Sequence, residues 1–344
     1  MKAPHPLPRA LLPLALLQLS CLPAGALAEP PAAQRAPGWE AGHIRAADGY
    51  RLPYRRWGPE PGAGDGPEAV VLALHGLNDY SKGMAYAARY LARHGIATYA
   101  YDQRGWGANE DAGLWPGIDP LLDDAAAVID LLAERYPGTP LYLMGHSMGG
   151  AVAMVLMAER SPEPVSGVVL LAPAVWGREA MPWYQRSALR LTARLLPGLE
   201  LSSEVAGTQP TDDPEIRAMM REDPLIRRTV RADTLAGVTD LMDRALAVAP
   251  GLSSRALILY GEQDEVIPPG PTCLMLRRLP EHPSERQRLA LYPEGYHMLT
   301  RDLQRERVHA DLAAWLLDPD GGDLPSGMGV TRSEAIQRLC PASR

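Results

Sequence analysis

The residues best suited to chemistry lie in the stretch Leu141–Ala151, which reads L-Y-L-M-G-H-S-M-G-G-A. The apolar run before Gly145 predicts a buried strand, and the run rich in Ala, Val and Met after Gly149 predicts a buried helix. Between them lies G-H-S-M-G, a G-x-S-x-G spacing that places a serine on a sharp strand-to-helix turn. Glycine on both sides leaves room for such a turn. Ser147 is therefore predicted to be a nucleophile.

A serine nucleophile needs a histidine base and an acid that orients the base. On this kind of turn the chain order is serine, acid, histidine. Asp264 follows a predicted strand closely enough to reach a histidine, with Glu262 and Glu265 as rival acids. His297 lies in the loop after the last predicted strand. We therefore predict that Ser147, Asp264 and His297 are the catalytic residues.

Acyl transfer also needs two donors for the oxyanion. The backbone N–H of Met148 directly follows the serine and is the first candidate. The second is the N–H of Leu77, in the H-G-L turn that ends another predicted strand. The run Asp102–Gly105, D-Q-R-G, is expected to brace the site through a buried ion pair.

Short apolar runs alternate with helical segments through most of the chain. The predicted strands are 69–74, 97–101, 141–144, 167–171, 256–260 and 288–291. Continuous apolar strands separated by helices indicate an α/β fold with a mostly parallel sheet covered on both faces. Sites in such sheets lie at the carboxyl ends of the strands, where all of the candidate residues fall.

The alternation stops between Ala174 and Ser254. Helices are predicted at 183–196, 213–222 and 232–249, with no strand among them. We expect residues 174–254 to form a helical lid between core segments 29–173 and 255–318, followed by a C-terminal tail at 319–344. Trp176 and Trp183 are expected to bind the acyl chain, because tryptophan suits a site that is wet at one end and apolar at the other. The lid is also a candidate for peripheral membrane contact.

The N-terminus has the pattern of a secretory signal peptide over residues 1–28. Positive charge precedes an apolar stretch too short to span a bilayer, and A-L-A at 26–28 fits a cleavage site. This pattern predicts a secreted or periplasmic protein, and the alternative is a lipoprotein anchored at Cys21. The remaining cysteines, Cys273 and Cys340, are hypothesised to form a disulfide that ties the C-terminal tail to the core.

The composition excludes several classes of protein. The chain has 344 residues and a formal net charge of −7, which argues against nucleic-acid binding. The sequence contains no H-E-x-x-H motif, no Cys/His cluster and no phosphate loop that follows a strand. We therefore expect no metal and no cofactor.

Taken together, these motifs resemble the monoacylglycerol lipase/lysophospholipase branch of the α/β-hydrolases, over about Gly42 to Leu317. The resemblance implies an α/β-hydrolase fold, a helical lid and a long acyl tunnel. It also implies cleavage of lipid-type carboxylic esters (monoacylglycerol, lysophospholipid or medium-chain esters) through an acyl-enzyme on Ser147. One departure concerns the family's H-G-x-G-E-H-S-x-R-Y stretch, whose polar residues help to hold glycerol. Here Gly83 replaces its arginine, which leaves a broader lysophospholipase or carboxylesterase role open.

Other functions on this fold remain open. An aminopeptidase of the proline iminopeptidase type needs acidic lid residues for the substrate amine, and Glu204, Asp212 and Asp213 are candidates. A binding protein on an inactive hydrolase fold normally loses catalytic residues, whereas this chain keeps all three. Comparison of p-nitrophenyl esters with amino-acyl anilides distinguishes esterase from peptidase.

Overall fold

The computed structural model describes residues 36–62, 66–202, 208–281 and 286–340. The strands of the main sheet are β1 (Gly38–Glu40), β2 (His43–Arg45), β3 (Arg51–Trp57), β4 (Ala69–Leu74), β5 (Ile96–Tyr101), β6 (Leu141–His146), β7 (Val165–Leu171), β10 (Ala256–Gly261), β11 (Gln287–Tyr292) and β12 (Gly329–Val330). The helices that cover this sheet are α1 (Ala85–Ala92), α2 (Ile118–Arg135), α3 (Met148–Glu159), α7 (Pro269–Arg278), α8 (Arg305–Leu317) and α9 (Arg332–Leu339).

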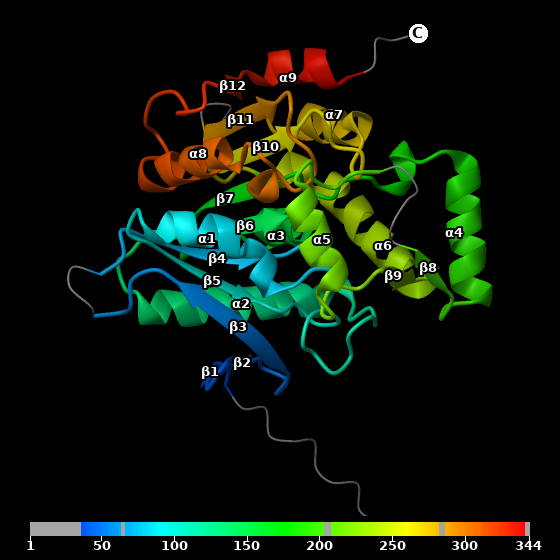
Figure 1. Cartoon of the computed structure of the whole chain (residues 1–344), viewed down its shortest axis with the longest axis horizontal. Coiled ribbons are helices and arrows are strands. Elements are labelled where there is room, and N and C mark those ends of the chain that lie inside the picture. Colours follow the sequence, from blue (N-terminus) through cyan, green and yellow to red (C-terminus); the bar gives the residue numbers. More distant parts are fainter. Residues whose placement is uncertain (1–35, 63–65, 203–207, 282–285, 341–344) are drawn as a thin grey trace, which may run out of the picture. The chain divides into compact units, whose positions relative to one another are not determined.

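The main sheet is mostly parallel (Figure 1). Its strand order is β1-β2-β3-β5-β4-β6-β7-β10-β11-β12. The strands from β5 to β11 in this order run parallel, whereas β1, β2 and β3 at one edge and β12 at the other pair antiparallel. The arrangement confirms the predicted α/β-hydrolase fold class.

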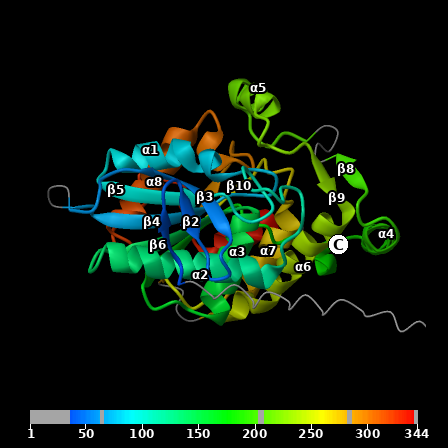
Figure 2. The same cartoon turned by 90° about the horizontal axis from the view of Figure 1, so that it is seen from below.

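Helices cover both faces of the sheet, with α1 and α8 on one face and α2 and α3 on the other (Figure 2). Alternate residues of β4 point to opposite faces, as the strand period requires. Val70 and Leu72 pack with α2 and α3, whereas Val71 and Ala73 pack with α1 and α8. Burial on both faces explains why these strands read as continuous apolar runs in the sequence.

The predicted lid contains α4 (Trp183–Leu195), α5 (Pro214–Glu222) and α6 (Ala232–Val248). The expectation that it has no strand was wrong, because β8 (Glu200–Ser202) and β9 (Thr229–Arg231) pair antiparallel. Each strand is only three residues long, too short for a period-two pattern to stand out. Cross-strand contacts join the pair, including a hydrogen bond from the Thr229 hydroxyl to Glu200.

The helices of this segment differ in how they pack. The apolar face of α6, including Leu241 and Leu246, is buried in the same core as α2 and α3. By contrast, α4 buries no residue. Figures 1 and 2 show α4, β8 and β9 to the right of the main sheet, and Figure 2 shows α5 above it. Within this segment, α6 therefore belongs to the core, whereas α4 stands apart from it.

The C-terminal segment is tied to the core as hypothesised. Cys273 of α7 and Cys340, just after α9, form a disulfide with a Cα–Cα distance of 5.3 Å. The tail also adds β12 to the sheet edge beside β11. Thr331 caps α9 through a reciprocal capping box with Glu334.

The predicted signal peptide and the alternative lipid-anchor site at Cys21 lie outside the described residues, so both stay predictions. None of the helices in the described ranges combines the length and the hydropathy that a membrane span requires.

Removal of the disulfide is expected to destabilise the protein. The bond closes a loop across a sequence separation of 67, and its loss increases the conformational entropy of the unfolded chain. A Cys273→Ser/Cys340→Ser variant should lose about 2–4 kcal/mol of unfolding free energy, measured by denaturant titration. Reduced wild type is the matched control and should lose a similar amount. Two free thiols in the denatured, unreduced wild-type protein would contradict the pairing.

Candidate active site

Ser147 occupies a strained turn between β6 and α3. Its φ angle of 51° lies in the left-handed region that non-glycine residues rarely adopt. A Cβ atom on Gly145 would overlap the carbonyl of Gly149, and one on Gly149 would overlap the backbone of Leu74. Only glycine at both positions permits the turn, as the sequence motif predicted.

Backbone hydrogen bonds connect this turn to the neighbouring strands. The Gly149 N–H donates to His75 O at 3.1 Å, and the Ser147 N–H donates to Leu171 O at 3.0 Å. The first of these brings the end of β4 beside the start of α3. Leu77 and Met148, the two predicted oxyanion donors, line the same cavity as Ser147. Among the described residues, neither of their N–H groups donates to a protein acceptor.

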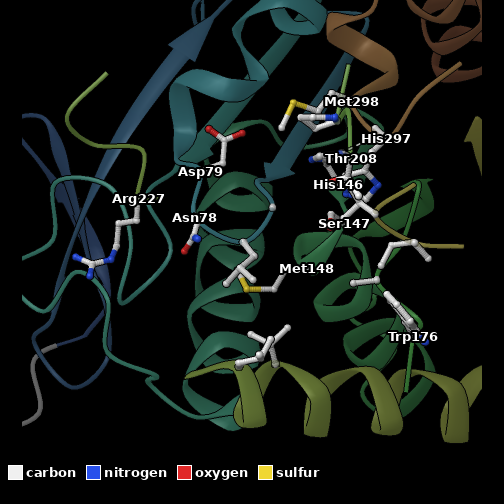
Figure 3. A pocket seen from close by; sticks show the side chains of 18 of the residues that line it. Asn78, Asp79, His146, Ser147, Met148, Trp176, Thr208, Arg227, His297 and Met298 are labelled. Atoms are coloured by element: carbon white, nitrogen blue, oxygen red, sulfur yellow. Dashed lines mark hydrogen bonds between the residues drawn. The ribbon is translucent and has the colours of Figure 1, made fainter. Parts of the chain in front are cut away.

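His297 and Asp264 are in direct contact although they are far apart in the sequence. His297 Nδ1 donates to Asp264 Oδ2 at 2.8 Å, and both residues are buried. The other carboxylate oxygen accepts the N–H groups of Val266 and Ile267 at 2.8 and 2.9 Å. These bonds fix the carboxylate and leave Nε2 as the free ring nitrogen of His297. His297 and Ser147 line the same cavity, where Figure 3 shows them close together.

The rival acids have other partners. Glu262 forms an ion pair with Arg338, and Glu265 accepts the N–H of Gln209 at 2.7 Å. Neither residue lines the cavity. Asp264 is therefore the one of the three acids that contacts His297.

Two further histidines support the site as neutral groups. His75 Nε2 accepts the Gln103 N–H at 2.9 Å, so its Nδ1–H donates to Gly76 O at 2.8 Å. His146 Nε2 donates to His297 O at 3.1 Å. Burial lowers the pKa of His75 and lowers that of His146 well below the usual value. Both rings therefore hold the turns around Ser147 and His297 without carrying charge.

The D-Q-R-G segment braces the structure differently from the single ion pair expected. Asp102 is buried and accepts hydrogen bonds from Ser81 N and Oγ at 3.0 and 2.5 Å. Arg104 forms the ion pairs, with Asp124 of α2 at 2.6 Å and with Asp48 at 2.5 Å. The segment therefore supports the structure, as predicted. Asp102 makes the hydrogen bonds and Arg104 makes the ion pairs.

Ser147 opens into a cavity of about 820 Å³ (Figure 3). Its apolar part is lined by Met148, Ala174, Trp176, Met181, Leu189, Leu235, Val238, Met242, Val266 and Ile267. Trp176 therefore lies where an acyl chain would be expected to bind. A cavity of this size and lining suits an elongated apolar ligand.

Trp183 does not line the cavity, which corrects the expectation from the sequence. Its residue is 71% exposed, and its ring contacts only Tyr184 among the described aromatic rings. The reason is helical phase, since Gln185 and Leu189 are the α4 residues that face the cavity. Trp183 precedes Gln185 by two positions, and residues two positions apart lie on nearly opposite sides of a helix.

The acidic lid residues expected for an aminopeptidase do not face the cavity either. Asp212 accepts the Leu303 N–H at 2.8 Å. Asp213 caps α5 and forms an ion pair with Arg305 at 2.8 Å. Both carboxylates therefore bind the segment that leads into α8, and Glu204 lies outside the described residues.

Gly83 has a guanidinium beside it that comes from a distant part of the chain. Buried Arg301 forms an ion pair with buried Asp79, which lines the cavity. A Cβ atom on Gly83 would overlap the Asp79 carboxylate and lie 2.8 Å from Arg301 Nη2. The missing side chain at position 83 leaves the space that this ion pair occupies.

Several cavity residues were not predicted from the sequence. They are Asn78, Asp79, Gln185, Thr208, Arg217, Met220, Arg221, Arg227 and Arg228, among others. The only local signal was the i, i+3, i+4 spacing of Arg217, Met220 and Arg221, which marks one face of a helix. Nothing in that spacing indicated which face would meet the cavity.

Comparison with known proteins identifies the family. The family model Hydrolase_4, described as "Serine aminopeptidase, S33", matches residues 65–304. The chain belongs to this family. It is 26% identical over 274 residues to the monoacylglycerol lipase of Mycolicibacterium smegmatis, covering 78% of this chain and 94% of the relative. It is 28% identical over 267 residues to human monoglyceride lipase, and the match covers 76% of this chain and 84% of the relative.

Solved structures show the same fold. The monoacylglycerol lipase of Paleococcus ferrophilus matches with a TM-score of 0.64 and 24% identity, covering 77% of this chain and 98% of that structure. A soluble variant of the Saccharomyces cerevisiae monoglyceride lipase, in complex with a substrate analogue, matches with a TM-score of 0.66 and 20% identity, covering 83% and 95%. This Hydrolase_4 chain is thus a monoacylglycerol lipase-like α/β-hydrolase.

Asp302 makes the stability of the site region dependent on pH. Its carboxylate accepts the Tyr296 N–H at 2.8 Å, next to His297. Burial raises the pKa of Asp302 from 3.8 to about 6, an effect that this hydrogen bond opposes. Between pH 4 and 6 the unfolded carboxyl is ionised while the folded one stays protonated. The Asp302 contribution to unfolding free energy is therefore full below pH 4 and falls as pH rises.

An Asp302→Asn variant keeps an acceptor for Tyr296 but cannot titrate. As pH rises from 4 to 7, the free energy of unfolding of wild type should fall by up to about 3 kcal/mol relative to that of this variant. Urea unfolding of both proteins across that range measures the difference, and any constant offset from the substitution cancels. Parallel stability curves would contradict the assignment.

Proposed function

We propose that this protein hydrolyses lipid-type carboxylic esters through an acyl-enzyme on Ser147. His297 Nε2 takes the proton from Ser147 Oγ as the oxygen bonds to the ester carbonyl carbon. The N–H groups of Leu77 and Met148 stabilise the oxyanion. When the tetrahedral intermediate collapses, the alcohol leaves with the proton from His297. Water, activated by the same histidine, then releases the fatty acid and restores Ser147.

The observation that carries the proposal is the hydrogen bond from His297 Nδ1 to Asp264. It fixes the tautomer with Nε2 unprotonated, which is the form that acts as a base. The apolar part of the cavity supports an ester of a fatty acid as substrate. The names of the relatives, monoacylglycerol lipase and monoglyceride lipase, point to the same class.

Peptidase activity is the second candidate, because the family description names a serine aminopeptidase. A substrate ammonium group would need an unpaired carboxylate in the cavity. The one carboxylate among the described lining residues, Asp79, is already paired with Arg301. Amino-acyl anilides should therefore be turned over far more slowly than p-nitrophenyl esters, and the reverse preference would favour the peptidase.

We also propose that α4 makes peripheral contact with a membrane in an exported protein. Exposed apolar side chains gather on and beside this helix: Trp183, Tyr184, Leu191, Leu195, Leu196 and Leu199. Arginines at 186, 190 and 194 recur every four residues, and the combination is typical of interfacial helices. A Leu191→Glu/Leu195→Glu variant should lose co-sedimentation with anionic lipid vesicles. Leu317→Glu, at an exposed leucine elsewhere, should retain it.

The roles of the three catalytic residues are tested by substitution. Ser147→Ala should abolish labelling by a fluorophosphonate probe and nearly all esterase activity. Asp264→Asn should lower kcat by about 10³–10⁴-fold, because the amide favours the wrong tautomer of His297. Glu262→Gln and Glu265→Gln are matched controls and should stay near wild type. Near wild-type turnover by folded Ser147→Ala protein would refute the mechanism.

Acyl-chain preference tests the apolar part of the cavity. For p-nitrophenyl esters, kcat/KM should rise from acetate into the medium-chain range, by about fourfold per methylene that becomes buried. Trp176→Ala should flatten this rise, because it removes an apolar wall. Trp183→Ala is the matched control, since that side chain lies outside the cavity, and it should keep the wild-type slope. A wild-type preference for acetate would contradict an acyl-binding cavity.

A further inference from the structure

The cavity has a second, cationic part formed by one face of α5 and the loop that follows. Arg217, Met220 and Arg221 all line the cavity, as their i, i+3, i+4 spacing on one helix allows. The next segment adds Arg227 and Arg228 to the lining. These arginines therefore border the same cavity as Ser147. The guanidinium of Arg227 is directed elsewhere, because it donates to Ala112 O and forms an ion pair with Glu200.

Hydrogen bonds to backbone carbonyls position two of these arginines. Arg217 Nη1 donates to Thr211 O at 2.6 Å, and Arg228 Nη2 donates to Arg221 O at 2.6 Å. The second bond places the Arg228 side chain at the C-terminal end of α5, beside Arg221. A guanidinium has five N–H donors, so each of the two retains donors for a ligand.

Among the described residues, three of the four arginines in this part of the cavity have no carboxylate partner. Arg227 forms an ion pair with Glu200 at 3.0 Å. Arg217, Arg221 and Arg228 form no ion pair with any carboxylate in the described part of the chain. The lining carboxylate of Asp79 is neutralised by Arg301. The cationic character is local, since the chain as a whole carries a net charge of −7.

We infer that Arg217, Arg221 and Arg228 bind a phosphate group of the substrate, so that the protein prefers lysophospholipid-type esters to uncharged monoacylglycerols. The inference rests on the proposed ester hydrolysis at Ser147. The apolar part of the cavity takes the acyl chain, and the arginines take the head group. Guanidinium matches phosphate through paired N–H donors, and an unbalanced positive cavity also concentrates anionic substrates.

Anionic lipid head groups at a membrane surface are the alternative ligand for these arginines. Arg217 is half-buried and faces the cavity together with Met220. The lining position favours a group that enters with the substrate. Arg221 and Arg228 are exposed but also line the cavity, whereas the exposed arginines of α4 at 186, 190 and 194 do not line it.

Two substrates with the same acyl chain separate the head-group effect from hydrolysis itself. They are 1-acyl lysophosphatidic acid and the matching 1-monoacylglycerol, each assayed below its critical micelle concentration with the full chain. Wild type should have the higher kcat/KM on the phosphate ester. In an Arg217→Gln/Arg221→Gln variant the ratio of the two kcat/KM values should fall at least about tenfold, through KM for the phosphate ester. Arg89→Gln, at an exposed arginine of α1, is the matched charge control and should keep the wild-type ratio.

Ionic strength gives an independent readout. KM for the phosphate ester should rise with NaCl in wild type and much less in the double variant, because the attraction is screened. A wild-type preference for monoacylglycerol, or an unchanged ratio in the double variant, would overturn the inference. An unchanged ratio with weaker binding to anionic vesicles would assign the arginines to the membrane instead. If neither ester is hydrolysed in a Ser147-dependent manner, the proposed function itself fails.

Discussion

The close approach of two backbones at the turn around Ser147 is the constraint on which the site depends. The α3 backbone at Gly149 touches the end of β4 so closely that no Cβ atom fits between them. This contact allows the hydrogen bond from Gly149 to His75 O. The same bond places the Leu77 turn beside the start of α3, where both proposed oxyanion donors meet the cavity. A larger residue at Gly149 would therefore displace the nucleophile and the second donor together.

The loop that carries His297 depends on contacts from the segment that follows β8. Met298 N–H donates to Pro210 O at 2.8 Å, and Asp212 and Asp213 bind the residues just before and within α8. Residues 210–213 therefore serve a structural role, although their acidic side chains fit a binding role on sequence grounds. They also connect α5, whose N-cap is Asp213, to the loop of the proposed base.

The cavity combines two environments that match the two ends of a lipid ester. Packing of α6 into the core supplies apolar side chains near Trp176, whereas α5, outside the core, supplies arginines. The buried pair of Asp79 and Arg301 lies between Gly83 and the cavity and cancels its own charge. Because that pair removes the acidic group from the lining, a substrate ammonium has no unpaired carboxylate to bind among the described lining residues. This charge distribution supports the proposal of ester rather than amino-acyl substrates.

The sequence alone determined the six central parallel strands, the turn at Ser147 and the order of the three catalytic candidates, since each is written in local patterns. Burial on both sheet faces makes parallel strands continuously apolar, and a strained turn admits only glycine at its close contacts. The pairing of β8 with β9, the outward direction of Trp183 and the Arg301 guanidinium beside Gly83 were decided only by the tertiary structure. Each depends on how segments distant in sequence pack, or on the rotation of one helix about its axis. The spacing of Arg217 and Arg221 puts them on one face of a helix, but only the position of α5 turned that face toward the cavity.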